Sequence, residues 1–164
     1  MNSISKKIVL VGHFGVGKSS LIRRFVLNAF SDDYKVTIGV QILKKEIQIK
    51  EQNLTLIIWD IEGKEDLKTL RQSYLLGTAG FIYVIDPTRD TTYTNLSVEL
   101  NFISENYPKA DVVSVANKSD LIDKLEFDKT LAEKNLKVDF YTSAKTGKNV
   151  ERIFEHLGIN LLKQ

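Results

Sequence analysis

Four short apolar runs, rich in β-branched and aromatic residues, divide the chain at intervals. They occupy residues 8–11, 54–59, 81–85 and 112–116. Runs of this length and composition favour strands that are covered on both faces, as in a parallel sheet. A shorter apolar group at 138–141 predicts one further strand near the end of the chain.

Apolar residues at helical spacing lie between and after these runs. One set predicts a helix before the 112–116 strand and consists of Leu96, Leu100, Ile103 and Tyr107. A second set predicts a helix after the last strand and consists of Val150, Ile153, Phe154, Leu157 and Leu161. Strand and helix therefore alternate along the chain, which is typical of an α/β protein.

The segment from Gln41 to Lys50 breaks this pattern, because isoleucines are mixed there with lysine and glutamate. A charged segment of this kind is typical of a strand at the edge of a sheet. The polar sequence KEQN at 50–53 predicts a hairpin turn into the 54–59 strand. The sequence thus predicts one antiparallel edge strand beside an otherwise parallel sheet.

Composition and charge narrow the class of protein. The chain has 164 residues, of which 43% are apolar and 27% charged, so we expect a single domain over residues 1–164. No apolar stretch approaches the roughly 20 residues that span a bilayer, and the start MNSISKK lacks a signal-peptide hydrophobic block, so we expect a cytoplasmic protein. With no cysteine, and with asparagine at position 2, no lipid anchor is expected. The formal charge of +2 is too near balance to argue for a nucleic-acid partner or an anionic membrane surface, so no nucleic-acid partner is expected.

The first chemical motif follows the 8–11 run directly. Residues 12–19 read GHFGVGKS, which matches the phosphate-loop pattern GxxxxGK[ST], and apolar positions at helical spacing follow. The glycines let the backbone turn its N–H groups toward phosphate oxygens at the start of a helix. Lys18 would contact the β- and γ-phosphates, and Ser19 would place its hydroxyl on Mg²⁺. The predicted nucleotide-binding residues of this loop are Gly12, Phe14, Gly15, Val16, Gly17, Lys18, Ser19 and Ser20.

A carboxylate after the 112–116 run indicates which base is bound. Asp120 ends the sequence Asn117-Lys118-Ser119-Asp120. Its side chain would accept hydrogen bonds from N1–H and N2–H₂ of guanine, groups that adenine does not present together. Ser143-Ala144-Lys145 follows the last predicted strand and would close over the O6 edge of the base. The sequence therefore predicts GTP or GDP as the ligand.

Taken together, these motifs resemble those of the Ras-superfamily small GTPases, and most of all the Rab branch. The resemblance spans nearly the whole chain and rests on five motifs in the family's order. These are the loop at 12–19, Thr37-Ile38-Gly39, Trp59-Asp60-x-x-Gly63, Asn117-Lys118-x-Asp120 and Ser143-Ala144-Lys145. The resemblance implies a three-layer α/β phosphate-loop fold, the small G-domain, with a mostly parallel sheet and one antiparallel edge strand. It also implies Mg²⁺ as cofactor, and as partners an effector, an exchange factor and an activating protein.

The resemblance assigns roles to further residues. Thr37 would bind Mg²⁺ through its hydroxyl and the γ-phosphate through its N–H. Asp60 would hold Mg²⁺ through water, and the N–H of Gly63 would sense the γ-phosphate. Phe30 would pack edge-on against the base, and Tyr34 would cover the phosphates. The implied metal ligands are Ser19, Thr37 and Asp60.

Two residues depart from the family's pattern in a way that bears on hydrolysis. Lys64 replaces a glutamine that accepts a hydrogen bond from the attacking water, and an ammonium group has three donors and no acceptor. We therefore expect slow intrinsic hydrolysis. A partner's arginine normally contributes a factor of roughly 10³–10⁵, and Phe14, where the family has a small residue, would crowd that arginine.

Glu62, which replaces a small residue before Gly63, has an open role. It would repel the triphosphate, pair with Lys64 or Lys18, or replace the missing acceptor. Alternatively, Glu62 and Lys64 both point to solvent, as loop charges usually do. The candidate catalytic residues are Lys18, Thr37, Glu62, Gly63 and Lys64.

Three functions are compatible with these motifs. The first is a switch in which Mg²⁺-GTP orders residues about 31–40 and 61–76, called switch I and switch II, for an effector. The second is a nearly inactive scaffold that stays loaded with GTP. The third, an ATP-dependent phosphotransferase, gives Asp120 no role. The residues expected to line the partner surface, unless half of them are core, are Ile38, Gly39, Val40, Trp59, Leu67, Leu70 and Tyr74.

Overall fold

The sheet has six strands in the order β2-β3-β1-β4-β5-β6, in a computed structural model that describes residues 3–33 and 35–164. The strands are β1 (Ile4–Val11), β2 (Val40–Ile49), β3 (Gln52–Ile61), β4 (Gly80–Ile85), β5 (Asp111–Ala116) and β6 (Phe140–Tyr141). The helices are α1 (Lys18–Leu27), α2 (Gln72–Leu75), α3 (Leu96–Asn106), α4 (Lys124–Glu133) and α5 (Val150–Leu161), with short 3₁₀ turns at Leu67–Thr69, Asp90–Thr92 and Ser119–Leu121.

The pairing of the strands confirms the predicted fold class. β1 pairs in parallel with β3 and β4, and β4–β5 and β5–β6 are also parallel. β2 pairs antiparallel with β3, from Val40 opposite Ile61 to Ile49 opposite Gln52. The charged segment is therefore the antiparallel edge strand, as its mixed pattern predicts.

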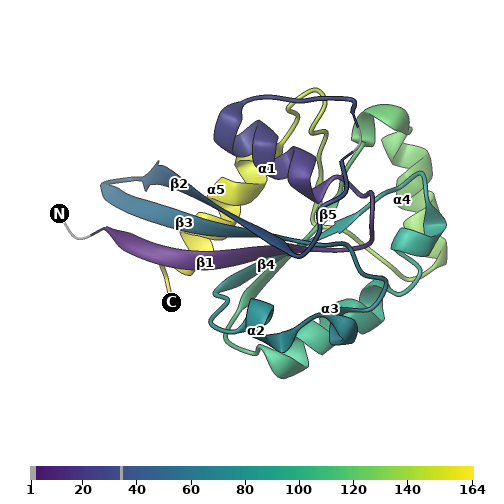
Figure 1. Ribbon diagram of the computed structural model, residues 1–164. Coiled ribbons are helices and arrows are strands. Elements are labelled where there is room, and N and C mark those ends of the chain that lie inside the picture. The colour runs from purple at the N-terminus through teal and green to yellow at the C-terminus, as the bar shows by residue number, and fades with distance from the viewer. Residues whose placement is uncertain (1–2, 34) are drawn as a thin grey trace.

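Helices cover both faces of this sheet and make a three-layer molecule (Figure 1). α1 and α5 pack on one face, where Phe25 and Phe154 stack with ring centroids 4.0 Å apart. α3 and α4 pack on the other face, together with α2 and the segment before it. Within the described residues, no helix is long and apolar enough to cross a membrane.

Two strands extend beyond the predicted runs. β1 begins at Ile4 rather than residue 8, because pairing with β3 also uses the backbone of polar residues. β3 spans Gln52–Ile61, so the hairpin turn is only Lys50 and Glu51, and Lys50 has a positive φ of 56°. Asp60 consequently lies inside the strand, where its position is fixed by neighbours on both sides.

The predicted elements differ from the structure in four places. The 138–141 strand shortens to Phe140–Tyr141, and α3 ends one residue before Tyr107. Leu67, Leu70 and Tyr74 do not share one helix, because Leu70 has extended backbone between a 3₁₀ turn and α2. Helix α4 is not predicted by apolar spacing. Its start nevertheless carries a capping signal, since the side chain of Asp123 accepts a hydrogen bond from the N–H of Glu126 at 3.1 Å.

The topology gathers four loops at one edge of the sheet. β1, β3, β4 and β5 are parallel, so their carboxyl ends lie together. The loops that follow them begin at Gly12, Glu62, Asp86 and Asn117. In open α/β sheets, ligands bind in the crevice outside these carboxyl ends. The fold therefore positions the predicted motifs next to one another.

Candidate nucleotide-binding site

The phosphate loop connects β1 to α1 and requires glycine at two positions. Gly12 has a φ of 145°, and a Cβ there would lie 2.3 Å from the carbonyl oxygen of Val84. Gly17 has a φ of 99°, and a Cβ there would lie 2.3 Å from the side-chain nitrogen of Asn117. Both the backbone conformation and the close neighbours exclude larger residues. The loop is thus packed between β4 and the Asn117 motif.

Lys18 is a buried cation at the start of α1. Its side chain is 6% exposed, and its Nζ donates to the carbonyl oxygens of Gly12 at 3.1 Å and His13 at 2.8 Å. Burial lowers the pKa of Lys18 to about 8, with Asp60 opposing this shift and Arg89 adding to it. A buried ammonium group that bonds only to neutral carbonyls is favourably placed for an anionic ligand.

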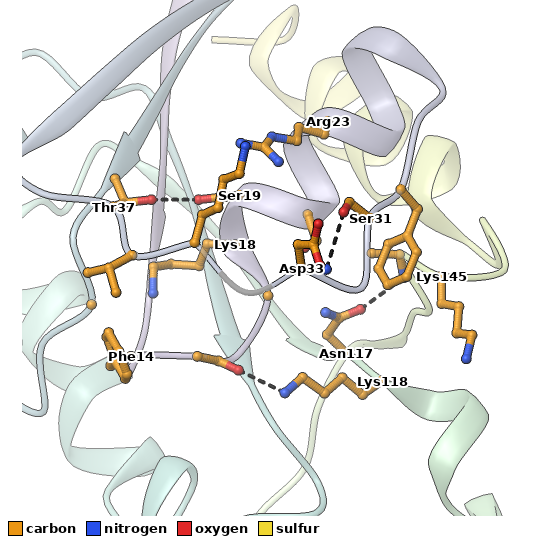
Figure 2. A pocket seen from close by; sticks show the side chains of 18 of the residues that line it. Phe14, Lys18, Ser19, Arg23, Ser31, Asp33, Thr37, Asn117, Lys118 and Lys145 are labelled. Atoms are coloured by element: carbon orange, nitrogen blue, oxygen red, sulfur yellow. Dashed lines mark hydrogen bonds between the residues drawn. The ribbon is translucent and has the colours of Figure 1, made fainter.

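The three implied metal ligands converge although they come from three separate segments. Ser19 Oγ donates to Asp60 Oδ2 at 2.5 Å. It also lies 2.7 Å from Thr37 Oγ1 (Figure 2). Asp60 is 1% exposed, and its other oxygen, Oδ1, has no hydrogen-bond partner among the described residues. Burial raises the pKa of Asp60, against the hydrogen bond from Ser19 and the charge of Lys18.

These groups fit a magnesium ion. Mg²⁺ prefers oxygen ligands and is usually held by one or two carboxylates together with waters and substrate phosphates. Two hydroxyls and one carboxylate with an unpartnered buried oxygen meet that requirement. Over residues 3–33 and 35–164, no three His, Cys, Asp or Glu side chains form a metal-binding group. An ion here would therefore depend on the phosphates of a nucleotide for further ligands.

The residues predicted to read the base lie at the other end of the site. Asp120 is exposed, and its Oδ1 accepts a hydrogen bond from Ser143 Oγ at 2.7 Å. Asn117 is buried and joins three segments. Its amide donates to Val16 O at 3.0 Å, and its carbonyl accepts from the N–H of Ala144 at 3.2 Å. The motif after β5, the motif after β6 and the phosphate loop are therefore held in one arrangement.

Lys118 is oriented by a buried carboxylate that the motifs do not include. Its Nζ donates to Gly15 O and to Asp86 Oδ2, both at 2.8 Å. Asp86 is fully buried at the end of β4. Burial alone would raise the pKa of Asp86, but hydrogen bonds from Lys118 and Thr88 outweigh it, so the pKa lies below its ordinary value. Lys118 thus spans from β4 to the phosphate loop.

A cavity of about 540 Å³ connects these groups. The predicted residues that line it are Phe14, Gly15, Gly17, Lys18, Ser19, Ser20, Phe30, Thr37, Gly63, Asn117, Lys118, Asp120, Ala144 and Lys145. Figure 2 shows Ser19 and Thr37 in contact on one side and Asn117 and Lys118 on another. Of the other predicted residues, Gly12, Val16, Asp60 and Ser143 are buried behind the lining. Tyr34 lies outside the described residues.

Comparison with known proteins agrees with this arrangement. A model of the Ras family matches residues 7–163. The chain belongs to the Ras family of small GTPases. One relative, Ras-related protein RABC1 of Arabidopsis thaliana, is 40% identical over 170 residues, an alignment that covers 96% of this chain and 77% of the relative. Family membership implies a guanine-nucleotide-binding switch, which is the class that the motifs predict.

In this GTPase, Glu62 and Lys64 lie together at the start of switch II. Lys64 Nζ is 3.8 Å from Glu62 Oε1, with the two side chains 41% and 33% exposed. Glu62 Oε2 also accepts from the N–H of Gly39 at 3.3 Å, and the N–H of Glu62 donates to Gly39 O at 2.9 Å. Of the roles considered for Glu62, the structure shows the pairing with Lys64. The contact with Gly39 additionally joins switch II to switch I.

Gly63 lies directly against the phosphate loop of the GTPase. A Cβ at Gly63 would lie 2.4 Å from Phe14 Cα and 2.9 Å from the carbonyl carbon of His13, so any side chain would displace one of the two segments. The N–H of Lys64 donates to Gly12 O at 3.2 Å. Phe14, 49% exposed, lines the cavity beside this contact.

Some of the residues predicted to line the partner surface are buried in the core, and others are exposed. Leu67 and Leu70 are buried in the core, whereas Ile38 is 86% exposed. Trp59 and Tyr74 are half-buried neighbours with ring centroids 6.4 Å apart. Lys7 Nζ lies 3.7 Å from the centroid of Trp59 and donates to the carbonyl oxygens of Tyr74 and Leu76 at 2.7 and 2.8 Å. Burial lowers the pKa of Lys7.

Arg24 is a second supporting residue that the motifs do not include. Its Nε donates to Ala144 O at 2.8 Å, and its Nη2 donates to Lys145 O at 2.6 Å. These bonds join α1 to the loop that carries the Ser143-Ala144-Lys145 motif. No local signal marks Arg24, because its partners lie 120 residues away in the sequence. Arg24 therefore holds the loop that is predicted to bind the base, without lining the cavity itself.

Arg24→Ala is expected to speed the release of GDP about tenfold. Hydrogen bonds from a charged donor contribute about 1.5–3 kcal/mol each. We expect the free energy of nucleotide binding to fall by about half the value of one such bond. Dissociation of a fluorescent GDP analogue would measure the effect. Arg24→Lys, which keeps a charged donor group, should release GDP at a rate between those of the wild type and Arg24→Ala. Arg152→Ala on α5 serves as the control. An unchanged release rate in Arg24→Ala would contradict the positioning role.

Proposed function

We propose that this protein is a Rab-like guanine-nucleotide switch that binds Mg²⁺ with GTP or GDP and hydrolyses GTP slowly. One observation carries the proposal. A single cavity is lined by the buried cation Lys18 and by Ser19 and Thr37 at one end and by the carboxylate of Asp120, the proposed guanine reader, at the other. ATP would leave Asp120 without donors to accept from, so an ATP-dependent phosphotransferase is disfavoured.

Each residue at the phosphate end of the cavity has a proposed role in binding the phosphates, holding the ion or sensing the γ-phosphate. Lys18 and the loop N–H groups would bind and orient the β- and γ-phosphates. Ser19 and Thr37 would hold the ion through their hydroxyls, with Asp60 behind them. When bound, Mg²⁺ neutralises charge that develops on the phosphate oxygens. The N–H of Gly63 would contact the γ-phosphate and so make the position of switch II depend on it.

Slow hydrolysis follows from the groups beside the attacking water. Lys64 offers donors only, so it cannot accept a hydrogen bond from that water. Glu62 is the only carboxylate among the candidate catalytic residues, and its two oxygens face Lys64 and Gly39. The chain therefore keeps the groups that stabilise phosphate charge but lacks the usual group that orients the nucleophile.

The two switches would respond together to the γ-phosphate. Glu62 and Gly39 exchange two hydrogen bonds, one between backbones and one from backbone to side chain. Any movement of switch II that removes Glu62 breaks both bonds and frees the Gly39 segment. An effector would recognise the ordered arrangement, with exposed Ile38 and half-buried Trp59 and Tyr74 as apolar contacts.

A second candidate function is a docking scaffold that stays loaded with GTP. The contact between Lys64 and Glu62 favours it, because it occupies the charged groups next to the hydrolytic site. The nucleotide carried by the purified protein separates the two functions. A switch should contain mostly GDP, and a scaffold should contain mostly GTP. Identification of that nucleotide, with single-turnover hydrolysis of Mg²⁺-GTP, tests the proposal in one preparation.

Lys64→Gln is expected to raise the single-turnover rate of GTP hydrolysis about tenfold or more. Glutamine restores both an acceptor for the water and a donor for the phosphate. Lys68→Gln is a matched control in the same segment, because Lys68 lies 3.7 Å from Asp66, much as Lys64 lies near Glu62.

Two results would contradict this assignment. A wild-type rate equal to that of ordinary small GTPases, unchanged in Lys64→Ala, would mean that another residue orients the water. If Glu62→Ala then lowered the rate, Glu62 would be that residue. A Lys64→Gln variant as slow as the wild type would likewise exclude Lys64 as the cause.

A further inference from the structure

Arg89 occupies a rigid turn at the edge of the phosphate loop. The turn follows β4, and the N–H of Arg89 donates to Asp86 O at 3.0 Å. Thr92 Oγ1 donates to Arg89 O at 2.7 Å, and the buried Thr92 also bonds to Asp86. Because Asp86 orients Lys118, the turn that carries Arg89 is fixed to the nucleotide site. The backbone position of Arg89 is therefore set by the same groups that hold the base motif.

The guanidinium of Arg89 reaches the part of the loop nearest the γ-phosphate sensor. Its Nη1 donates to the carbonyl oxygen of Phe14 at 2.7 Å, and the residue is exposed. Phe14 and Gly63 form a wall shared by the nucleotide cavity and a second hollow of about 640 Å³. Arg89, His13 and Lys64 line that second hollow. A guanidinium has five N–H groups, so the bond to Phe14 leaves others to meet an anion.

We propose that Arg89 is a catalytic residue of this GTPase, a built-in arginine whose guanidinium contacts the terminal phosphate of GTP during hydrolysis. The proposal rests on the function proposed above and deepens it. Phe14 would crowd an arginine supplied by a partner, and Phe14, Lys64 and Arg89 all line the second hollow. An arginine supplied by the same chain is a known arrangement in GTP hydrolysis, where it stabilises charge in the transition state.

The reaction assigned to this site is a simple displacement. A water oxygen forms a bond to the γ-phosphorus as the bond from that phosphorus to the bridging oxygen breaks. The electron pair of the broken bond stays on GDP, and the water protons leave with the phosphate, so GTP⁴⁻ and H₂O give GDP³⁻ and H₂PO₄⁻. Arg89 would donate hydrogen bonds to the oxygens whose charge grows during this step.

A planar aluminium fluoride bound beside GDP tests the proposal without measuring turnover. This complex resembles the phosphoryl group in transfer, so it forms where the stabilising cations are all present. The protein would be mixed with Mg²⁺, GDP, aluminium and fluoride, without any partner, and bound fluoride would be observed by ¹⁹F NMR. We expect a bound signal in the wild type and at least a tenfold lower occupancy in Arg89→Ala.

Matched variants make each outcome informative. Arg89→Lys should retain partial occupancy, and Arg152→Ala on α5, which lines neither hollow, should equal the wild type. The proposal is overturned if Arg89→Ala binds the fluoride like the wild type, if the wild type binds none while it binds GDP, or if Arg89→Ala loses GDP affinity, since Arg89 would then only support the loop. If the wild type fails to bind GDP, the proposed function itself fails.

Discussion

Asp120→Ala is expected to weaken GTP and GDP binding by about 10²–10⁴-fold and to leave the weak binding of ATP unchanged. Asp120 would accept two hydrogen bonds from guanine, and bonds to a charged group contribute about 1.5–3 kcal/mol each. Every 1.4 kcal/mol corresponds to a factor of ten. Titration calorimetry with each nucleotide in the presence of Mg²⁺ would measure the change.

Two companion variants show whether the effect comes from base reading. Asp120→Asn offers one donor and one acceptor, so it should gain affinity for xanthosine diphosphate, whose C2 carbonyl replaces the amino group of guanine. Glu133→Ala removes an exposed carboxylate from α4 and should change nothing. If Asp120→Ala kept its preference for guanine over adenine, another group would read the base.

The second large effect is expected at the predicted metal ligands. Asp60→Ala should release GDP about 100-fold faster than the wild type in the presence of Mg²⁺. The variant loses the buried carboxylate that stands behind Ser19 and Thr37, and a bound divalent ion contributes several kcal/mol of charge stabilisation. Release of a fluorescent GDP analogue would be followed with Mg²⁺ and then with EDTA.

The chelator separates a metal role from loss of structure. EDTA should speed release from the wild type to the rate of the variant, and it should have little further effect on Asp60→Ala. Asp60→Asn keeps the shape of the side chain without its charge and should behave like the alanine variant. A variant that responds to EDTA as strongly as the wild type would exclude Asp60 from the metal site.

The fold and most lining residues could be predicted because their signals are local. The phosphate loop needs glycine at Gly12 and Gly17 for backbone reasons that are visible in eight consecutive residues. Apolar runs likewise mark strands that are covered on both faces. Where pairing rather than apolarity extends a strand, as at the start of β1, the same reasoning stops short.

The supporting residues could not be predicted, because long-range contacts define them. Arg24 bonds to carbonyls in a loop more than 100 residues away, and backbone carbonyls leave no trace in the sequence. Asp86 resembles any aspartate after a strand until Lys118 is placed 2.8 Å from it. The break between Leu67 and Tyr74 has a similar origin, because Glu99 on α3 accepts from the N–H of Leu67 at 2.8 Å and pins the first turn.

The contact of Lys7 with Trp59 makes the molecule its own optical reporter. Trp59 is the chain's single tryptophan, so all indole emission arises at one place. The amine above its ring donates to the carbonyl oxygens of Tyr74 in α2 and of Leu76 just after it, both within switch II. Breaking the hydrogen bonds between Lys7 and these carbonyls would move the positive charge relative to the indole ring and so change the electric field at the indole. We therefore expect the ultraviolet fluorescence of the unlabelled protein to change when nucleotide exchange rearranges switch II.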